Sequence, residues 1–416
     1  MKKLLAILLS VIMVLSLVAC GNKTQDETPS NDDQQQNTET ETKTIKVGLI
    51  CIGDENDQGY TYNFIRGKES ATEALAAKGI NVDWVVKYNI GEDSTCEDAN
   101  IELAEEGCEL IFNNSYGFEP FMLKVAPDYP EIQFVGCTNQ GSWNDGLDNT
   151  HNAFANIYEG RYLAGVAAGL KLNEMIDNGD FAAEDAKIGY VGAFTYAEVV
   201  SGYTSFFLGA RSVCPTATME VTFTGSWYDE TAEKEAANKL IANGCKLVSQ
   251  HADSMGAPTA CETAGVPNVS YNGSTISACP NTFIVSSRID WAPYYEFVIN
   301  AVANGKTIPA DWTGTLATGS VVLTEVNEAA AAAGTADKIA EVKAALEAGT
   351  IHVFDTATFT VGGETLTSYM ADVDTDPNYE ADTEVILDGY FHESEMRSAP
   401  YFDLRIDGIT LLDEAY

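Results

Sequence analysis

The chain has 416 residues and a formal net charge of −39, with 62 acidic side chains against 23 basic ones. This imbalance argues against nucleic acid or an anionic membrane surface as a partner, because phosphate binding needs basic patches. A chain of this length is long enough to bury the cores of two ordinary domains.

The first twenty residues, MKKLLAILLSVIMVLSLVAC, combine a basic start with a short apolar run. The run is too short for a membrane span and predicts a signal peptide over residues 1–19. Because it ends in LVAC, which resembles a bacterial lipobox, Cys20 is the predicted site of lipid attachment. An ordinary secretory signal with a chance cysteine is the alternative. Residues 20–43 have no large apolar side chain after Cys20, and this predicts a disordered tether.

From residue 45 onward, short apolar runs alternate with helical segments, and this pattern predicts a parallel sheet with helices on both faces. Four strands are expected in the first half of the chain. They cover residues 45–52, 82–90, 109–115 and 132–137.

The alternation restarts after residue 158, which predicts a second lobe rather than one wide sheet. It begins with a helix over 160–175, in which Gly165 and Gly169 allow close packing. An Ala-rich helical stretch is expected over 325–349 and a strand over 351–355. The other strands of this lobe are expected at residues 187–193, 219–225, 246–252, 268–272 and 282–287.

Polar and aromatic side chains follow the ends of almost all these strands. Since ligands bind beyond the carboxyl ends of strands in open parallel sheets, this pattern predicts a cleft between two lobes that holds a flat, polar ligand. The predicted ligand-binding residues are Tyr60, Tyr62, Asn63, Ser115, Tyr116, Trp227, His251, Asp253, Asn272 and Trp291.

Aromatic and amide side chains occupy the first of these loops, where a phosphate site would carry glycines. Tyr60 and Tyr62 are candidates to stack on a neutral ring, with Tyr62 the favoured one, and Asn63 offers a donor and an acceptor to the ring edge. Trp227 is the candidate for the opposite face of the ring. Trp291 either contacts the ligand or packs at the hinge.

Asp253 is the strongest single candidate, because an ionised carboxylate at a strand end accepts two hydrogen bonds from a ligand. The alternative role is the N-cap of the helix that starts near Met255. His251 either contacts the ligand or orients Asp253.

The sequence contains no catalytic motif and no metal-ligand spacing, so no cofactor, metal or catalytic residue is predicted. A metal-dependent nucleoside hydrolase using Asp54, Asp57 and Asp253 is kept as a remote alternative. Besides Cys20 the chain has eight cysteines without a CxxC pair. The sequence is compatible both with disulfides between these cysteines and with buried free thiols.

The chain carries the motifs DQGYTYNFIRGKESA, NSYGF, EGRYLAGVAAG, SWYDETAEKEAANKLIANGCKLVSQHADS and SRIDWAPYYEFVINAVANG. Together these motifs resemble the BMP (basic membrane protein) family of lipoproteins, which are purine nucleoside and base receptors of ABC importers. The resemblance covers about residues 45–322. HADS departs from the run that nucleoside receptors carry, and it looks closer to members that bind a free purine such as adenine.

The resemblance implies an α/β type I periplasmic-binding fold, with two doubly wound parallel-sheet lobes joined by three crossing segments. The implied N-terminal lobe is 44–157 plus 284–306, and the C-terminal lobe is 158–283 plus 307–416. The expected function is that of a non-enzymatic, monomeric lipoprotein on the extracytoplasmic face of a bacterial membrane, which captures a purine and delivers it to an ABC permease. A sensor protein that presents its ligand to a signalling receptor is the alternative.

Overall fold

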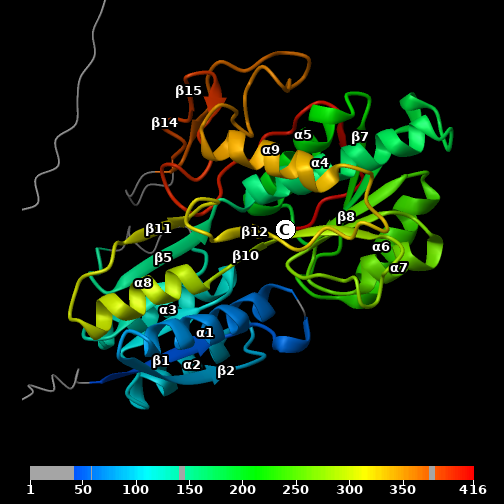
Figure 1. The fold of residues 1–416 in the computed structure, drawn as a ribbon. Helices are drawn as coiled ribbons and strands as arrows, with labels where there is room; N and C mark the ends of the chain where they lie inside the picture. The colour runs from blue at the N-terminus through cyan, green and yellow to red at the C-terminus, as the bar shows by residue number, and fades with distance from the viewer. Residues whose placement is uncertain (1–41, 58, 140–145, 374–379) are drawn as a thin grey trace, which may run out of the picture. The chain divides into compact units, whose positions relative to one another are not determined.

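The computed structural model describes residues 42–57, 59–139, 146–373 and 380–416 (Figure 1). The predicted signal peptide, Cys20 and all but the last two residues of the predicted tether lie outside the described residues. From Glu41 to Tyr416 the chain forms one compact unit. Its longer strands gather in two separate sheets.

The first sheet has six strands within the described residues, in the order β2-β1-β3-β4-β5-β11, and all neighbouring strands run parallel. In β1, Val47 and Leu49 belong to one buried cluster and Ile50 to another, so the strand is covered on both faces. This double burial explains its nearly continuous apolar sequence. The strands are β1 (Lys43–Ile50), β2 (Ile80–Lys87), β3 (Leu110–Asn113), β4 (Gln133–Gly136), β5 (Thr150–Ala155) and β11 (Asp311–Gly314).

Helices cover both faces of the first sheet, and together they form the N-terminal lobe. On one face α1 (Tyr60–Ala76) packs beside α8 (Ala292–Ala303). On the other face lie α2 (Ser94–Glu105) and α3 (Glu119–Val125). The start of α1 is fixed by the partly buried carboxylate of Asp57, which accepts hydrogen bonds from the backbone N–H groups of Thr61 and Tyr62.

The second sheet has seven strands within the described residues, in the order β12-β10-β9-β8-β6-β7-β17. All its pairs are parallel except β10 with β12. The strands are β6 (Lys187–Gly192), β7 (Thr218–Phe223), β8 (Leu247–His251), β9 (Asn268–Tyr271), β10 (Phe283–Ile289), β12 (Val321–Leu323) and β17 (Ile409–Leu411).

The helices of the C-terminal lobe include one very close pair, α4 and α5. A Cβ added at Gly165 would lie 2.0 Å from the carbonyl oxygen of Phe206, and one at Gly209 would lie 2.0 Å from that of Tyr162. The glycines therefore permit the close packing that the sequence predicted. The helices of this lobe are α4 (Ile157–Asp177), α5 (Ala197–Val213), α6 (Glu230–Ala242), α7 (Gly256–Ala264) and α9 (Thr335–Glu347).

The chain passes between the two sheets three times, as expected for the predicted fold class. The first crossing joins β5 to α4, the second joins β10 to α8, and the third joins β11 to β12. The lobes are therefore linked by three short connections rather than one. Such a set of connections is a hinge at which two rigid lobes can close on a ligand.

Two strands fall in lobes that differ from the predicted boundaries. β10 belongs to the second sheet through β9 and β12, so residues 284–289 are not part of the N-terminal lobe. β11 pairs with β5 in the first sheet, so residues 311–314 are not part of the C-terminal lobe. Strand pairing between distant segments decides this membership, and the apolar pattern of a single strand carries no information on it.

Two predicted elements near the end of the chain also differ. The helix expected over 325–349 covers only Thr335–Glu347, because Gly334 at its N-cap takes a φ of 79° that α-helix does not allow. Residues 351–355 form no strand, and only Asp355 makes an isolated bridge, to Tyr390.

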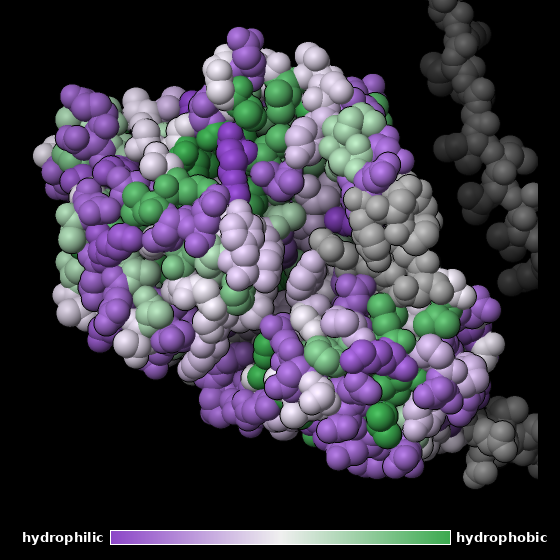
Figure 2. Space-filling view, turned by 180° about the vertical axis from the view of Figure 1, so that it is seen from behind, coloured by the Kyte–Doolittle hydropathy of each residue, from purple (hydrophilic) through white to green (hydrophobic). Residues whose placement is uncertain are grey.

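The eight cysteines in the described part of the chain are all buried free thiols. Burial raises their pKa values, to about 12 for Cys96 and Cys245, which makes them inert small apolar side chains. The outer surface is largely hydrophilic, as the face shown in Figure 2 illustrates. This agrees with the acidic composition.

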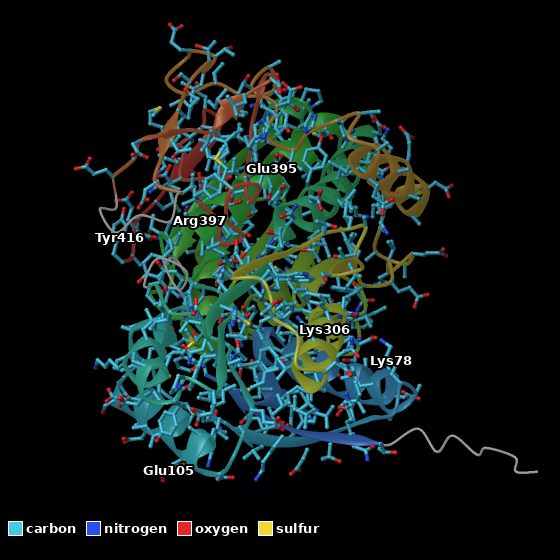
Figure 3. The ribbon with its side chains drawn as sticks, turned by 90° about the vertical axis from the view of Figure 1, so that its left-hand side faces the viewer. Lys78, Glu105, Lys306, Glu395, Arg397 and Tyr416 are labelled. Carbon is cyan, nitrogen blue, oxygen red and sulfur yellow. The ribbon has the colours of Figure 1, made fainter. Side chains whose placement is uncertain are left out.

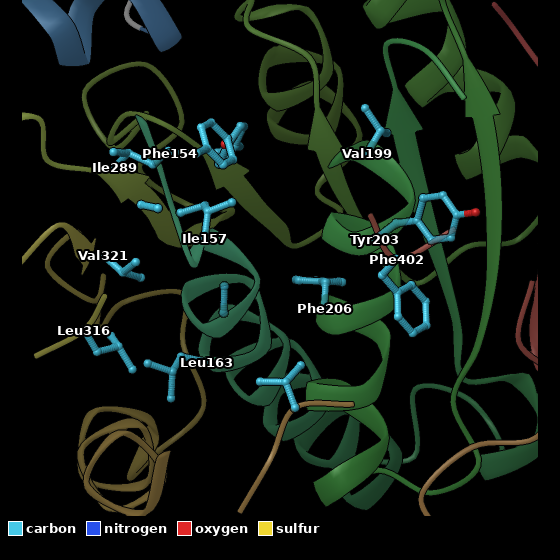
Figure 4. Close-up of a cluster of buried hydrophobic side chains, with 14 of the residues drawn as sticks. Phe154, Ile157, Leu163, Val199, Tyr203, Phe206, Ile289, Leu316, Val321 and Phe402 are labelled. Atoms are coloured by element: carbon cyan, nitrogen blue, oxygen red, sulfur yellow. The ribbon is translucent and has the colours of Figure 1, made fainter. Parts of the chain in front are cut away.

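The final segment, from residue 350 onward, wraps over the C-terminal lobe with little regular structure. It contains two short antiparallel pairs and ends in β17, which extends the second sheet beside β7. Phe402 of this segment belongs to the same buried cluster as Tyr203 and Phe206 of α5 (Figure 4). The segment is thus part of the core. The short pairs are β13 (Met370–Ala371) with β14 (Thr383–Glu384), and β15 (Ile386–Leu387) with β16 (Tyr390–Phe391).

Candidate functional site

A cavity of about 300 Å³ is lined by residues of both lobes. Its volume is at the small end of the range for small-molecule sites. The loops that follow β1 and β3 form it from one side, and those that follow β6 and β8 form it from the other. In each sheet these two strands are adjacent but not consecutive in the chain. They flank the topological switch point, where open parallel sheets bind ligands.

Aromatic rings line much of the cavity. Tyr116, from the loop after β3, stacks on Tyr196, from the loop after β6, with ring centroids 5.6 Å apart. Trp227 lies 6.3 Å from Tyr196. Tyr60 stands at the start of α1 and donates its hydroxyl to the carbonyl oxygen of Cys137 at 2.8 Å. The site therefore offers ring faces from both lobes to a planar ligand.

Asp253 lines the cavity and accepts a hydrogen bond from Asn272 Nδ2 at 2.7 Å. Burial raises the pKa of its carboxyl well above the usual value, Asp57 and Glu233 raise it further, and the Asn272 bond opposes this. The residue is not the N-cap of α7, because Met255 holds that position and the N–H of Gly256 donates to the Ser254 hydroxyl at 3.0 Å. Asp253 is thus left with its second oxygen free of any structural bond to α7.

His251 lies beside Asp253 in the cavity wall and bonds to Glu198. Its Nε2 is 2.7 Å from Glu198 Oε1, and its Nδ1 is 3.4 Å from the hydroxyl of Tyr190. Burial, followed by the nearby Arg161, lowers the pKa of His251 to about 4, while Glu198 raises it. At neutral pH the ring is therefore uncharged, with the Nε2 proton donated to Glu198.

The two lobes touch at the edge of the cavity, so the structure has the cleft closed. Asn63 Nδ2 lies 3.2 Å from both the backbone oxygen and the side-chain oxygen of Asn272 in the opposite lobe. A Cβ added at Gly59 would lie only 2.9 Å from the backbone oxygen of Asp253. The absence of a side chain at Gly59 allows this approach.

Seven of the ten predicted ligand-binding residues line the cavity and three do not. Tyr62 is turned away from it and lies under the Arg66 guanidinium, 5.5 Å from the ring centroid, so Tyr60 rather than the favoured Tyr62 faces the cavity. Tyr60 and Tyr62 are two positions apart in α1, so their side chains point about 200° apart around the helix axis. Trp291 is buried and stacks on Phe64 at 4.2 Å, and Asn63 bridges the lobes. The seven are Tyr60, Ser115, Tyr116, Trp227, His251, Asp253 and Asn272.

The sequence interpretation missed several residues of the cavity wall. Tyr196 and Glu198 follow β6 directly, so the rule of strand ends, applied to KIGYVGAFTYAE, identifies them. Four others come from the last eighteen residues, far from any predicted strand, and have no local signal. They are Ala399, Pro400, Asp403 and Tyr416.

The charge of the site is negative. Glu198, Asp253 and Asp403 line it, and no Lys or Arg is among the described residues that do. Among the described residues, no group of three or more His, Cys, Asp or Glu side chains is placed to hold a metal ion. The wall is thus rich in hydrogen-bond acceptors and in ring faces.

The profile of one protein family, the Bmp family of PnrA-like ABC transporter substrate-binding proteins, matches residues 44–353. This is about three quarters of the chain. The chain belongs to this family. The Bmp match ends after α9, so it covers both sheets apart from Lys43 and β17. It includes every cavity residue except the four near the C-terminus.

Two curated relatives and one solved structure are similar to the chain. The chain is 32% identical over 261 residues to a purine-binding protein of Brucella abortus (strain 2308), covering 63% of this chain and 69% of that one. It is 29% identical over 288 residues to a putative ABC transporter glucose-binding protein of Haloferax volcanii, covering 69% and 68%. An ABC transporter solute-binding protein from Aeropyrum pernix K1 superimposes with a TM-score of 0.63 at 18% identity, covering 74% and 93%. This structural likeness confirms the predicted fold.

The chain is therefore a member of a family of ABC transporter substrate-binding proteins, a class that acts outside the cytoplasm. Of the helices in the described ranges, none has the length and apolar character needed to cross a bilayer.

Proposed function

We propose that this protein captures a purine base or nucleoside, with adenine favoured, in the cavity between its lobes and delivers it to an ABC permease. The observation that carries the proposal is the combination of the Tyr60 and Trp227 rings with the Asp253 carboxyl group in one closed wall, which has no Lys or Arg among its described residues. Ring faces suit a planar heterocycle, and Asp253 suits its N–H donors. The similarity to a protein named as purine-binding supports this choice.

A hexose is the second candidate, because one relative is named as a putative glucose-binding protein. Aromatic side chains also pack against sugar rings, so the walls alone do not decide between the two. The acceptors favour the purine, since one oxygen each of Glu198, Asp253 and Asp403 is already engaged, by His251, Asn272 and Tyr369, and this suits a ligand with few donors.

We further propose that Cys20 carries a lipid after cleavage of residues 1–19, and that the following tether places a monomeric receptor at the outer face of the cell membrane. The sequence features that support this are the LVAC motif and the absence of large apolar side chains in residues 21–43. The partner of the loaded receptor is the membrane permease of the transporter.

The decisive experiment identifies the ligand directly. Purified protein is denatured, the released small molecules are weighed by mass spectrometry, and calorimetry then compares adenine, adenosine and D-glucose. We expect a purine to be released and to bind with the highest affinity. Release of a hexose, or glucose binding without purine binding, contradicts the proposal.

The affinity for the purine should depend little on ionic strength, because stacking and hydrogen bonds to a neutral ring are not screened by salt. We expect less than a twofold change in Kd between about 0.05 and 0.5 M NaCl. Over this range the Debye length shortens enough to weaken ion pairs. Calorimetry at several salt concentrations checks this. A steep loss of affinity with rising salt means that the ligand is charged.

A further inference from the structure

The last part of the chain reaches the cavity although it lies beyond the residues that the family profile covers. The profile ends at residue 353, whereas Ala399, Pro400, Asp403 and Tyr416 line the cavity. Arg397 and Tyr416 lie on the same flank of the protein (Figure 3). The chain therefore comes to the cavity twice after the profile ends, once at 399–403 and again at its final residue.

Ser398 ties this segment to the N-terminal lobe. Its hydroxyl donates to Asp311 Oδ1 at 2.5 Å and accepts from Asn152 Nδ2 at 2.6 Å. Its backbone N–H donates to Asp311 Oδ2 at 2.7 Å. Asp311 begins β11 and Asn152 lies in β5, both in the first sheet, and Ser398 is fully buried between them.

The residues that follow are tied to the C-terminal lobe. The backbone N–H groups of Tyr401 and Phe402 donate to the buried carboxylate of Glu393 at 3.2 and 2.9 Å. The Phe402 ring stacks on Phe354 at 4.1 Å. Farther along, Arg405 Nη1 donates to the hydroxyl of Tyr203 in α5 at 2.7 Å. Ala399 and Pro400 thus lie between an anchor in one lobe and anchors in the other.

We propose that residues 398–403 are a fourth link between the lobes and a ligand-contacting wall of the cavity, with Ser398 as the residue that positions the wall. A segment held at both ends costs little additional ordering entropy when a ligand packs against it. Ala399 and Pro400 then limit the size of the ligand. The ligand contact rests on the proposed function, whereas the link between the lobes does not.

The wall is tested with Ala399→Leu, which fills part of the cavity, and with adenine as the probe. We expect the adenine Kd to rise at least tenfold, because a larger side chain in a small closed cavity displaces the ligand. The matched control is Ala357→Leu, at an exposed position elsewhere in the final segment from residue 350 onward. This control should change Kd less than twofold. An Ala399→Leu variant that folds and binds adenine as tightly as the unchanged protein overturns the wall.

The link is tested without any ligand by hydrogen exchange in Ser398→Ala. We expect the amides of Ala399, Tyr401 and Phe402 to exchange at least tenfold faster, while those of β17 keep their rates. Unchanged exchange overturns the link, and with it the positioning role of Ser398. Where the unchanged protein binds no adenine, the purine proposal fails, and this measurement still decides the link. Where it binds adenine and Ser398→Ala leaves exchange and Kd unchanged, the segment is only a passive cover and the purine proposal stands.

Discussion

Asp253→Asn should weaken purine binding by tens- to hundreds-fold while leaving the thermal midpoint of the ligand-free protein nearly unchanged. In the unchanged protein Asn272 Nδ2 donates to Asp253 Oδ1 at 2.7 Å, and the oxygen that remains in Asp253→Asn can still accept this bond. The other oxygen becomes an NH₂ group that faces the N–H donors of the ligand. A donor against a donor in a closed cavity costs about 2–4 kcal/mol.

The structure removes the alternative explanation for this variant, since the N-cap of α7 is Met255 rather than Asp253, and the N–H of Gly256 donates to the Ser254 hydroxyl. The measurement is the adenine Kd by calorimetry together with the ligand-free thermal midpoint. Asp229→Asn is the matched control, because Asp229 caps α6 through the N–H of Ala232 outside the cavity and Asn caps about as well as Asp. Unchanged affinity in Asp253→Asn takes Asp253 out of the ligand site.

Gly59→Val should prevent the lobes from closing and reduce purine affinity about a hundredfold, with Gly59→Ala about tenfold. The added Cβ would lie 2.9 Å from the backbone oxygen and 3.0 Å from the Cβ of Asp253 in the other lobe. Backbone atoms do not move aside as a flexible side chain does, so the contact opposes the closed form by about 1–3 kcal/mol. The open form has no such contact, and the ligand-free stability should be unchanged.

Small-angle scattering with and without adenine measures this effect, because a protein that cannot close does not become more compact with ligand. Gly91→Ala is the control, since its Cβ would meet only the carboxylate of the exposed Asp93. Compaction of Gly59→Val by adenine, with an unchanged Kd, means that closing does not bring Gly59 and Asp253 together.

Much of the site follows from the sequence alone. Apolar runs mark the central strands, and in a parallel sheet all carboxyl ends meet at one edge, so the residues after those ends are brought together whatever the details of packing. This logic identifies Tyr116, Trp227 and Asp253 without a structure. It also reaches Tyr196 and Glu198 when it is applied to β6.

Sequence also determined that the chain has two lobes, because a strand–helix alternation that restarts after a glycine-rich helix indicates a second sheet. The packing of α4 on α5 through Gly165 follows from the same local pattern. These features depend on which residues are near one another in the chain, and the periodicity of apolar side chains records that.

Only the tertiary structure decided the features that depend on contacts between distant segments. Tyr60 rather than Tyr62 faces the cavity because the position of α8 and Trp291 fixes the rotation of α1. β10 and β11 each lie in the lobe opposite to the predicted one, because β10 pairs with β9 and β11 pairs with β5. The wall at 398–403 exists because Ser398 meets Asp311, 87 residues away. A local pattern states that a side chain is to be buried or bonded but not against which partner, and long-range pairing alone supplies that partner.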